Sequence, residues 1–156
     1  MNTRRAIWAT AVAALVLLGA VGTWFLLPPS TGFVVIDVEP GPGGAQVRGS
    51  CNVDGNHRDL SCTAPARFTI EGHKFVFSFA PEEETQAFAV KVAAGDREFG
   101  WVRSGPTHRG IHGLIEFERF SFRYGINTFD SKTMTPEQAK GVANRSPTFT
   151  FPRSKQ

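Results

Sequence analysis

The sequence contains few of the residues that carry most enzyme chemistry. Its 156 residues include two cysteines, four histidines and one tyrosine. It has no Gly-x-Ser-x-Gly segment, which presents the serine nucleophile in α/β-hydrolases. Its Gly-Pro-Gly-Gly stretch lacks the lysine of a phosphate-binding loop. We therefore predict that the protein is not an enzyme and has no catalytic residue and no cofactor.

Metal ligands are also scarce. His108 and His112 are four residues apart, a spacing that would place both on one face of a helix. Pro106, Gly110 and Gly113 disfavour a helix in this segment. Two cysteines alone do not make a zinc site, and Cys51 and Cys62 lack the C-x-x-C spacing of zinc ligands. We predict no metal site.

The excess of positive charge is small. The chain has 17 basic and 14 acidic residues. Two of the basic residues, Arg4 and Arg5, stand at the N-terminus ahead of a long uncharged run. The chain after that run therefore carries 15 basic and 14 acidic residues, a net charge of +1. A part of the chain that is close to neutral lacks the basic surface that nucleic-acid binding requires. We predict no nucleic-acid partner.

The longest run without a charged residue or a proline covers residues 6–27. As a helix this run would span ~33 Å, which matches the ~30 Å hydrocarbon core of a bilayer. Arg4 and Arg5 precede it, and positive residues stay in the cytoplasm. We predict a cytoplasmic N-terminus over residues 1–5 and a transmembrane anchor over residues 6–27. Its expected membrane-interface residues are Arg4, Arg5, Trp8, Trp24 and Phe25.

A cleaved signal peptide is the alternative interpretation of this run. Signal peptides have a shorter apolar core and small residues at the cleavage site. The residues around the end of this run are bulky or proline, which favours an uncleaved signal anchor. We predict a single-pass inner-membrane protein with a linker at residues 28–32 and a C-terminal domain on the periplasmic or extracellular side.

The two cysteines, Cys51 and Cys62, both follow the predicted anchor. Disulfides form and persist in oxidising compartments outside the cytoplasm. We therefore predict an intramolecular disulfide between Cys51 and Cys62. Two free thiols, or pairing with another chain, are the alternatives.

Phenylalanine is abundant, and all but one of the 14 phenylalanines follow residue 27. Aromatic residues suit strands, where they pack on a pleated surface. Short strand patterns alternate with Gly/Pro turns through residues 33–125, and Asp54-Gly55 is typical of a hairpin turn. This pattern predicts an antiparallel β-sandwich, with an open barrel as the alternative.

The strand pattern is longest between Leu114 and Tyr124. Ile115 and Phe117 alternate on one face, and the aromatic residues that follow continue one residue out of phase. A β-bulge near Glu118 would restore the face. A strand buried on both faces is the alternative.

Residues 126–156 form a C-terminal extension with a different pattern. Thr135, followed by Pro136 and Gln138, is typical of a helix start with a capping box, and the helix should end near Ala143. Phe149 and Phe151 alternate in a segment flanked by prolines, which suits an edge strand. The segment could instead be an extended tail on a neighbouring protein.

Three stretches resemble PEGA-type domains, which are extracytoplasmic β-sandwich modules. Residues 32–40 and 43–47 match the first strand and turn of that family, residues 63–68 match its Thr-Pro region, and residues 71–76 match its Gly-x-His strand start. The resemblance covers residues 32–93 and implies a non-enzymatic envelope module. Residues 48–61 depart from the pattern as an insertion bounded by a cysteine, and the chain from Phe99 onward has no counterpart.

The fold class we predict is mainly β, with an N-terminal transmembrane helix, an antiparallel β-sandwich and one short helix near the C-terminus. The expected function is that of an accessory or scaffold subunit that stabilises a larger membrane protein complex. The expected partners are the membrane and other membrane protein subunits. Small residues let helices approach closely, and exposed aromatic residues favour interfaces. The residues expected to contact a partner are Gly19, Gly22, Phe149, Phe151 and Arg153.

An envelope module that binds cell-wall polymer or carbohydrate is the alternative function. Such a site would need a groove lined by Trp101, Tyr124 or the histidine-containing loop around His108 and His112.

Overall fold

The computed structural model describes residues 30–94, 97–105, 109–119, 121–145 and 148–152, together with Ala13 and Val16. Within these residues the strands form two antiparallel sheets. The small sheet has the order β5-β1-β7-β8, with β1 (Gly32–Pro40), β5 (Ala66–Gly72), β7 (Phe88–Ala94) and β8 (Arg97–Arg103).

The large sheet has the order β11-β10-β9-β6-β2-β3, and β4 pairs with β2 beside β3. Its strands are β2 (Ala45–Val53), β3 (Asn56–Asp59), β4 (Cys62–Ala64), β6 (Lys74–Pro81), β9 (Gly110–Phe117), β10 (Ser121–Phe129) and β11 (Phe149–Pro152).

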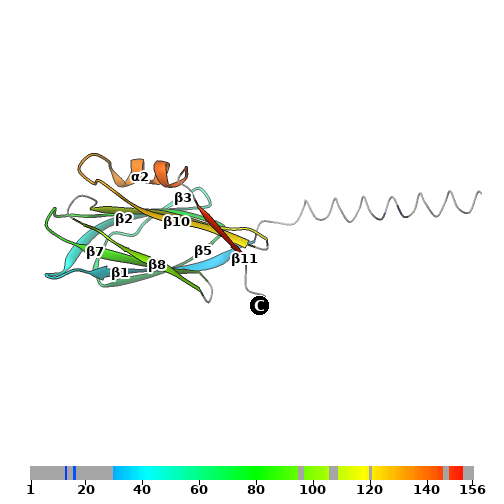
Figure 1. The fold of residues 1–156 in the computed structure, drawn as a ribbon, viewed down its shortest axis with the longest axis horizontal. Helices are drawn as coiled ribbons and strands as arrows, with labels where there is room; N and C mark the ends of the chain where they lie inside the picture. The colour runs from blue at the N-terminus through cyan, green and yellow to red at the C-terminus, as the bar shows by residue number, and fades with distance from the viewer. Residues whose placement is uncertain are drawn as a thin grey trace, which may run out of the picture.

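The two sheets lie face to face, and the helix α2 (Pro136–Ala143) covers the outer face of the large sheet (Figure 1). Thr135 caps this helix, and its side chain and that of Gln138 form both hydrogen bonds of the capping box. The mainly β fold with antiparallel sheets and a short C-terminal helix agrees with the sequence prediction. Pro136 at the first turn and Ala143 at the end also agree with it.

The core lies between the sheets. Alternate residues of β1 point inward, and Val34, Ile36 and Val38 are at most 1% exposed. They share one apolar cluster with Phe75 and Phe77 of β6. The other face of β6 is buried as well, because Val76 and Ala80 cluster with Ala143 and Ala139 of α2.

Phenylalanine and glycine form cross-strand pairs in the large sheet. Phe79 pairs with Gly49, and Phe77 pairs with Gly113. A Cβ atom built on either glycine would overlap the ring of its partner phenylalanine. Each ring thus occupies the space of the side chain that glycine lacks, an arrangement that compensates for glycine in a strand. This pairing explains why a chain rich in phenylalanine is also rich in strand glycines.

The transmembrane helix was predicted for residues 6–27, of which only Ala13 and Val16 are among the described residues. No helix in the part of the chain that the structure describes is long and apolar enough to cross a membrane. The helix α2 has eight residues, about 12 Å, against the ~30 Å of a bilayer core. The transmembrane-helix and signal-anchor predictions, which rested on hydropathy, length and the flanking residues of the run, are corrected accordingly. Outside the described residues lie Arg4, Arg5, Trp8, Gly19, Gly22, Trp24 and Phe25.

The predicted disulfide is also wrong, because Cys51 and Cys62 are free thiols. Cys62 lies opposite Val47 on β2, whereas Cys51 lies four residues further along β2, opposite Arg58. Four strand residues span ~13 Å, well beyond the ~7 Å limit between the Cα atoms of a disulfide. The register of one hairpin thus keeps the two thiols apart.

We expect the two thiols to differ in reactivity. Burial raises the pKa of the Cys51 thiol to about 12 and also raises the pKa of Cys62, so the reactive thiolate is scarce at neutral pH. A maleimide should label half-buried Cys62 first and fully buried Cys51 only after denaturation, as read by mass spectrometry. A reducing agent should leave the Tm unchanged. A native mass that is two hydrogens lower would contradict the free thiols.

The bulge predicted near Glu118 is a hairpin turn. Phe117 of β9 pairs with Phe122 of β10, and the backbone N–H of Glu118 donates to the carbonyl of Ser121 at 2.8 Å. A chain reversal returns the residues on both sides of the turn to the same sheet face, which produces the change of phase. The turn contains no glycine, asparagine or proline, so the usual turn signal is missing.

Candidate functional site

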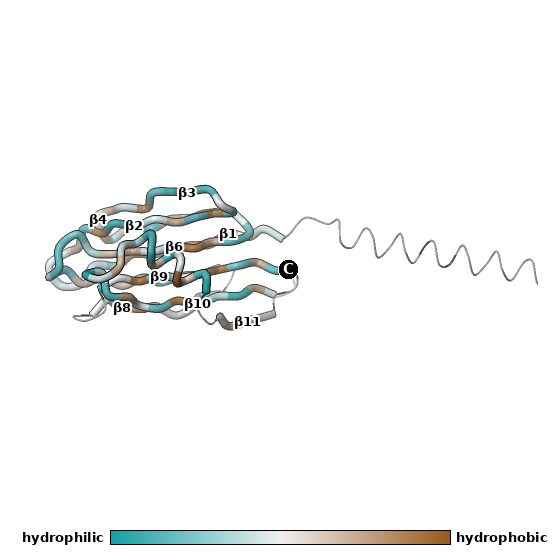
Figure 2. The backbone as a smooth tube through the Cα atoms, turned by 90° about the horizontal axis from the view of Figure 1, so that it is seen from above, coloured by the Kyte–Doolittle hydropathy of each residue, from teal (hydrophilic) through white to brown (hydrophobic). Residues whose placement is uncertain are grey.

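One side of the sandwich has an incomplete sheet edge. Figure 2 shows β8, β10 and β11 along this side, with β3 and β4 along the other. β11 pairs only with the first four residues of β10, from Ser121 to Tyr124. The rest of β10, Gly125–Phe129, pairs with β9, and no strand among the described residues pairs with its other edge. We call Gly125–Phe129 the open edge.

The direction of the backbone groups on the open edge follows from the hairpin. The N–H of Glu118 donates to Ser121, and hydrogen-bonded pairs recur at every second residue of an antiparallel ladder. The odd-numbered residues of β10 therefore point their N–H and C=O groups at β9. Ile126 and Thr128 point theirs at the open edge, where they could bond an added strand.

Half-exposed apolar side chains lie beside the open edge. Val102, Tyr124 and Ile126 are partly buried and pack against the core cluster, and β8 contacts β10. Phe149 of β11 is 65% exposed, and its ring centroid lies 6.1 Å from that of Tyr124. We call these four side chains the apolar seam. Exposed apolar side chains that lie together make this surface a candidate interaction site.

The open edge lacks the devices that usually protect an edge strand. Its sequence, Gly-Ile-Asn-Thr-Phe, has no charge and no proline. The opposite edge of the same sheet differs, because β3 exposes all four of its residues, among them His57, Arg58 and Asp59. Charged residues on an edge discourage strand pairing. The β3 edge of the large sheet thus carries charged residues that discourage strand pairing, and the open edge on β10 carries none.

A second candidate is a polar cleft between α2 and the β2–β3 hairpin. It has a volume of about 400 Å³. The side chain of Lys140 is 4% exposed, and its ammonium nitrogen lies 2.8 Å from Glu137 Oε2, 3.3 Å from Asn52 Oδ1 and 3.4 Å from His57 Nδ1. An ammonium group has three donors, so these three neighbours occupy it fully. Lys140 thus fastens α2 to the β2–β3 hairpin.

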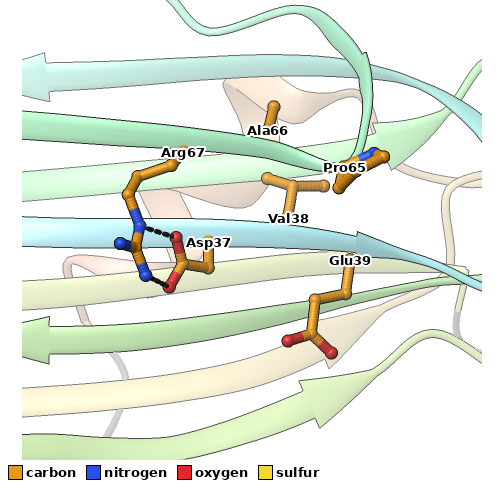
Figure 3. A pocket seen from close by; sticks show the side chains of 6 residues that line it. All are labelled: Asp37, Val38, Glu39, Pro65, Ala66 and Arg67. Carbon is orange, nitrogen blue, oxygen red and sulfur yellow. Dashed lines mark hydrogen bonds and ion pairs between the residues drawn. The ribbon is translucent and has the colours of Figure 1, made fainter.

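A third candidate is a shallow hollow of about 320 Å³ on the outer face of the small sheet. Arg67 donates to both carboxylate oxygens of Asp37, at 2.5 and 2.8 Å, and Figure 3 draws no interaction between Glu39 and this pair. The hydrogen bond and charge of Arg67 lower the pKa of Asp37. The pair is satisfied and exposed at Arg67, so the hollow presents little that a ligand could use.

His112 is buried under α2 instead of lining a groove. It is 3% exposed, stacks on Phe129 with ring centroids 5.7 Å apart, and lies opposite Ser78. Neither His112 Nδ1 nor Ser78 Oγ has a hydrogen-bond partner among the described residues. Burial lowers the pKa of His112, because the apolar surroundings disfavour the imidazolium.

This burial predicts a pH dependence of stability. The unfolded chain binds a proton at His112 near the ordinary pKa of 6.5, whereas the folded chain binds it only at lower pH. The free energy of unfolding should therefore fall as the pH drops below about 6.5. His112→Gln should remove part of this dependence in urea titrations between pH 7.5 and 5.

Carboxylate titration occupies a lower pH window and serves as the control. Hydrogen bonds from Lys132 and Arg109 lower the pKa of Glu84, and Lys140 lowers that of Glu137. Their contributions to stability are lost only as the pH falls below about 4.5. An identical slope above pH 5 in wild type and His112→Gln would contradict the assignment to His112.

The residues predicted to contact a partner have different outcomes in the structure. Phe149 is exposed in the apolar seam, Phe151 belongs to β11 by its backbone, and Arg153 lies outside the described residues. Of the predicted carbohydrate groove, Tyr124 lies in the seam. His108 lies outside the described residues, and nothing is described of the Trp101 side chain.

Sequence reasoning missed Ile126, Thr128 and Lys140. The uncharged run Gly125–Phe129 was the available signal for the first two. A lone lysine on a short helix carries no such signal.

No model of a known protein family matches the chain. No curated protein is significantly similar to it. The resemblance to PEGA-type domains therefore stays a prediction.

Proposed function

We propose that this chain is a non-catalytic β-sandwich module that serves as an accessory or scaffold subunit of a larger protein assembly. It docks on a partner protein through the apolar seam. The observation that supports this most is Phe149, a large aromatic side chain that is 65% exposed on an edge strand. Aromatic residues dominate the binding energy of protein interfaces.

The neighbours of Phe149 strengthen the proposal. The Tyr124 ring lies beside it at a tilt of 41°, and Val102 and Ile126 continue the apolar surface toward the core. Side chains anchored in a core lose little conformational freedom on binding, which favours affinity. The seam is thus a preorganised surface on rigid strands.

The alternative, a module that binds cell-wall polymer or carbohydrate, has weaker support. The polar cleft at α2 would be its site, and the described lining of that cleft contains Val76 as its apolar side chain and no aromatic ring. Polar pockets without an aromatic or apolar surface offer a ligand little besides exchange of hydrogen bonds with water.

Location outside the cytoplasm, and partners that lie in a membrane, stay predictions from the sequence. A C-terminal reporter that is active only outside the cytoplasm tests the first. A cytoplasmic signal from the full-length fusion would contradict it.

The docking proposal is tested with two matched variants. Phe149→Ser and Phe33→Ser remove phenylalanines of similar exposure, 65% and 56%, from different surfaces. Both should change the stability by less than about 0.5 kcal/mol, because the side chains are exposed. At native abundance the wild type and Phe33→Ser should migrate in a large complex, and Phe149→Ser should migrate alone. A wild-type protein that migrates alone, or equal effects of both variants, would overturn the proposal.

A further inference from the structure

The open edge offers a partner more than an apolar surface. Ile126 and Thr128 together direct two N–H and two C=O groups outward, and no strand among the described residues pairs with them. Backbone groups in this arrangement fit an extended chain, because only a strand presents donors and acceptors at the same repeat. A flat apolar partner would leave these groups unpaired.

β11 shows that this edge accepts a strand. It pairs with β10 in regular antiparallel register up to Tyr124 and Phe149. The open edge continues in the same line from Gly125 to Phe129, a length of about 17 Å. A second strand placed end to end with β11 would complete the pairing of β10.

From these observations we propose that the open edge receives an extended segment of the partner protein as an added strand, with uncharged side chains turned toward the apolar seam. This inference rests on the proposed function and specifies its binding mode. Alternate side chains of the added strand would cover Ile126 and Val102. The absence of charge on Gly125–Phe129 favours a segment whose contacting side chains are also uncharged.

A second copy of this chain fits the open edge less well. Pairing two copies of β10 about a two-fold axis near Asn127 would set β11 of each copy against the chain that follows Phe129 in the other. That chain forms a turn, in which Thr133 and Met134 donate their N–H groups to the carbonyl of Asp130. The turn and β11 would compete for the same space.

The test uses the full-length protein and a defined probe, an acetylated and amidated Thr-Phe-Thr-Phe-Thr-Phe-Thr peptide that extends the alternation of β11. Amide hydrogen exchange is followed by NMR. The probe should slow exchange of the Ile126 and Thr128 amides by about tenfold or more, since these N–H groups would become hydrogen-bonded.

Two variants of Thr128 isolate the backbone contribution. Thr128→Pro removes one outward N–H without removing a bond to β9, and proline is tolerated on edge strands. Thr128→Val keeps the N–H and serves as the matched control. Thr128→Pro should bind the probe about tenfold more weakly than Thr128→Val, the loss expected for one backbone hydrogen bond.

Four outcomes would overturn the strand-addition proposal. The first two are that the probe protects neither amide, or that it protects the β5 or β8 edge instead. The third is protection that rises with protein concentration before the probe is added. The fourth is that a probe N-methylated at alternate residues binds as tightly as the unmethylated probe. The last outcome would leave docking through Phe149 intact, because the N-methylated probe keeps its side chains. Failure of the Phe149→Ser experiment would instead remove the proposed function itself.

Discussion

Replacing Phe77 by alanine should lower the free energy of unfolding by about 3–5 kcal/mol. Phe77 is fully buried in the middle of β6, between the two sheets. Its ring packs against Phe79 with centroids 6.1 Å apart, and it covers Gly113 on β9. Removing the ring loses the transfer free energy of burial and leaves a cavity that a glycine neighbour cannot fill.

The size of this effect is large for a domain of this length. Domains of this size are usually stable by about 5–15 kcal/mol, so Phe77→Ala should shift the urea midpoint strongly. Phe33→Ala is the matched control, because Phe33 is 56% exposed and should change the stability by less than about 0.5 kcal/mol. Similar losses in both variants would mean that Phe77 does not lie in the core.

The second large effect should come from Gly113→Ala, with a loss of about 1–3 kcal/mol. A Cβ atom at this position would overlap the Phe77 ring, and the ring cannot move far in a packed core. Gly105→Ala is the matched control, because a Cβ there meets nothing within 4 Å. Chemical denaturation of the two variants and the wild type measures the difference.

A double variant tests whether the ring and the glycine are coupled. In Phe77→Leu the smaller side chain leaves space next to Gly113, so adding Gly113→Ala to Phe77→Leu should cost less than adding it to the wild type. Contacting residues show such non-additivity, whereas distant ones do not. Strict additivity would show that the ring does not occupy the space above Gly113.

The helix α2 shows what local sequence can predict. Thr135, Pro136 and Gln138 are adjacent in the chain and form the capping box without help from distant residues. The β2–β3 turn is similar, because Asp54 and Gly55 both adopt positive φ angles, 53° and 88°, which Asp-Gly pairs favour. Both predictions were confirmed because the interactions that decide them span only a few residues.

The hairpin of β9 and β10 shows where local reasoning failed. The residues from Leu114 to Tyr124 read as one strand because the turn after Glu118 contains no turn residue. Pairing of Phe117 with Phe122 and of Ile115 with Tyr124 stabilises the reversal through cross-strand contacts. The same kind of long-range register separated Cys51 from Cys62.

Sequence reasoning also predicted one part of the candidate site and missed another. An edge strand containing Phe149 was predicted from the alternation between prolines, and the structure places Phe149 on an edge strand at 65% exposure. The importance of Ile126 and Thr128 depends on where β11 stops along β10. Nothing in the residues Gly125–Phe129 themselves shows that their neighbour ends at Tyr124.

The amino-acid sequence by itself determined the strand-rich composition, the Asp54-Gly55 turn and the limits of α2. Each of these depends on residues close together in the chain. The tertiary structure alone decided which strands are neighbours, where the two thiols lie, which glycines sit under phenylalanine rings, and that β10 has an unpaired edge beside an apolar seam. Those features depend on the register between distant segments, and register is set by the sum of many weak side-chain contacts across the two sheets.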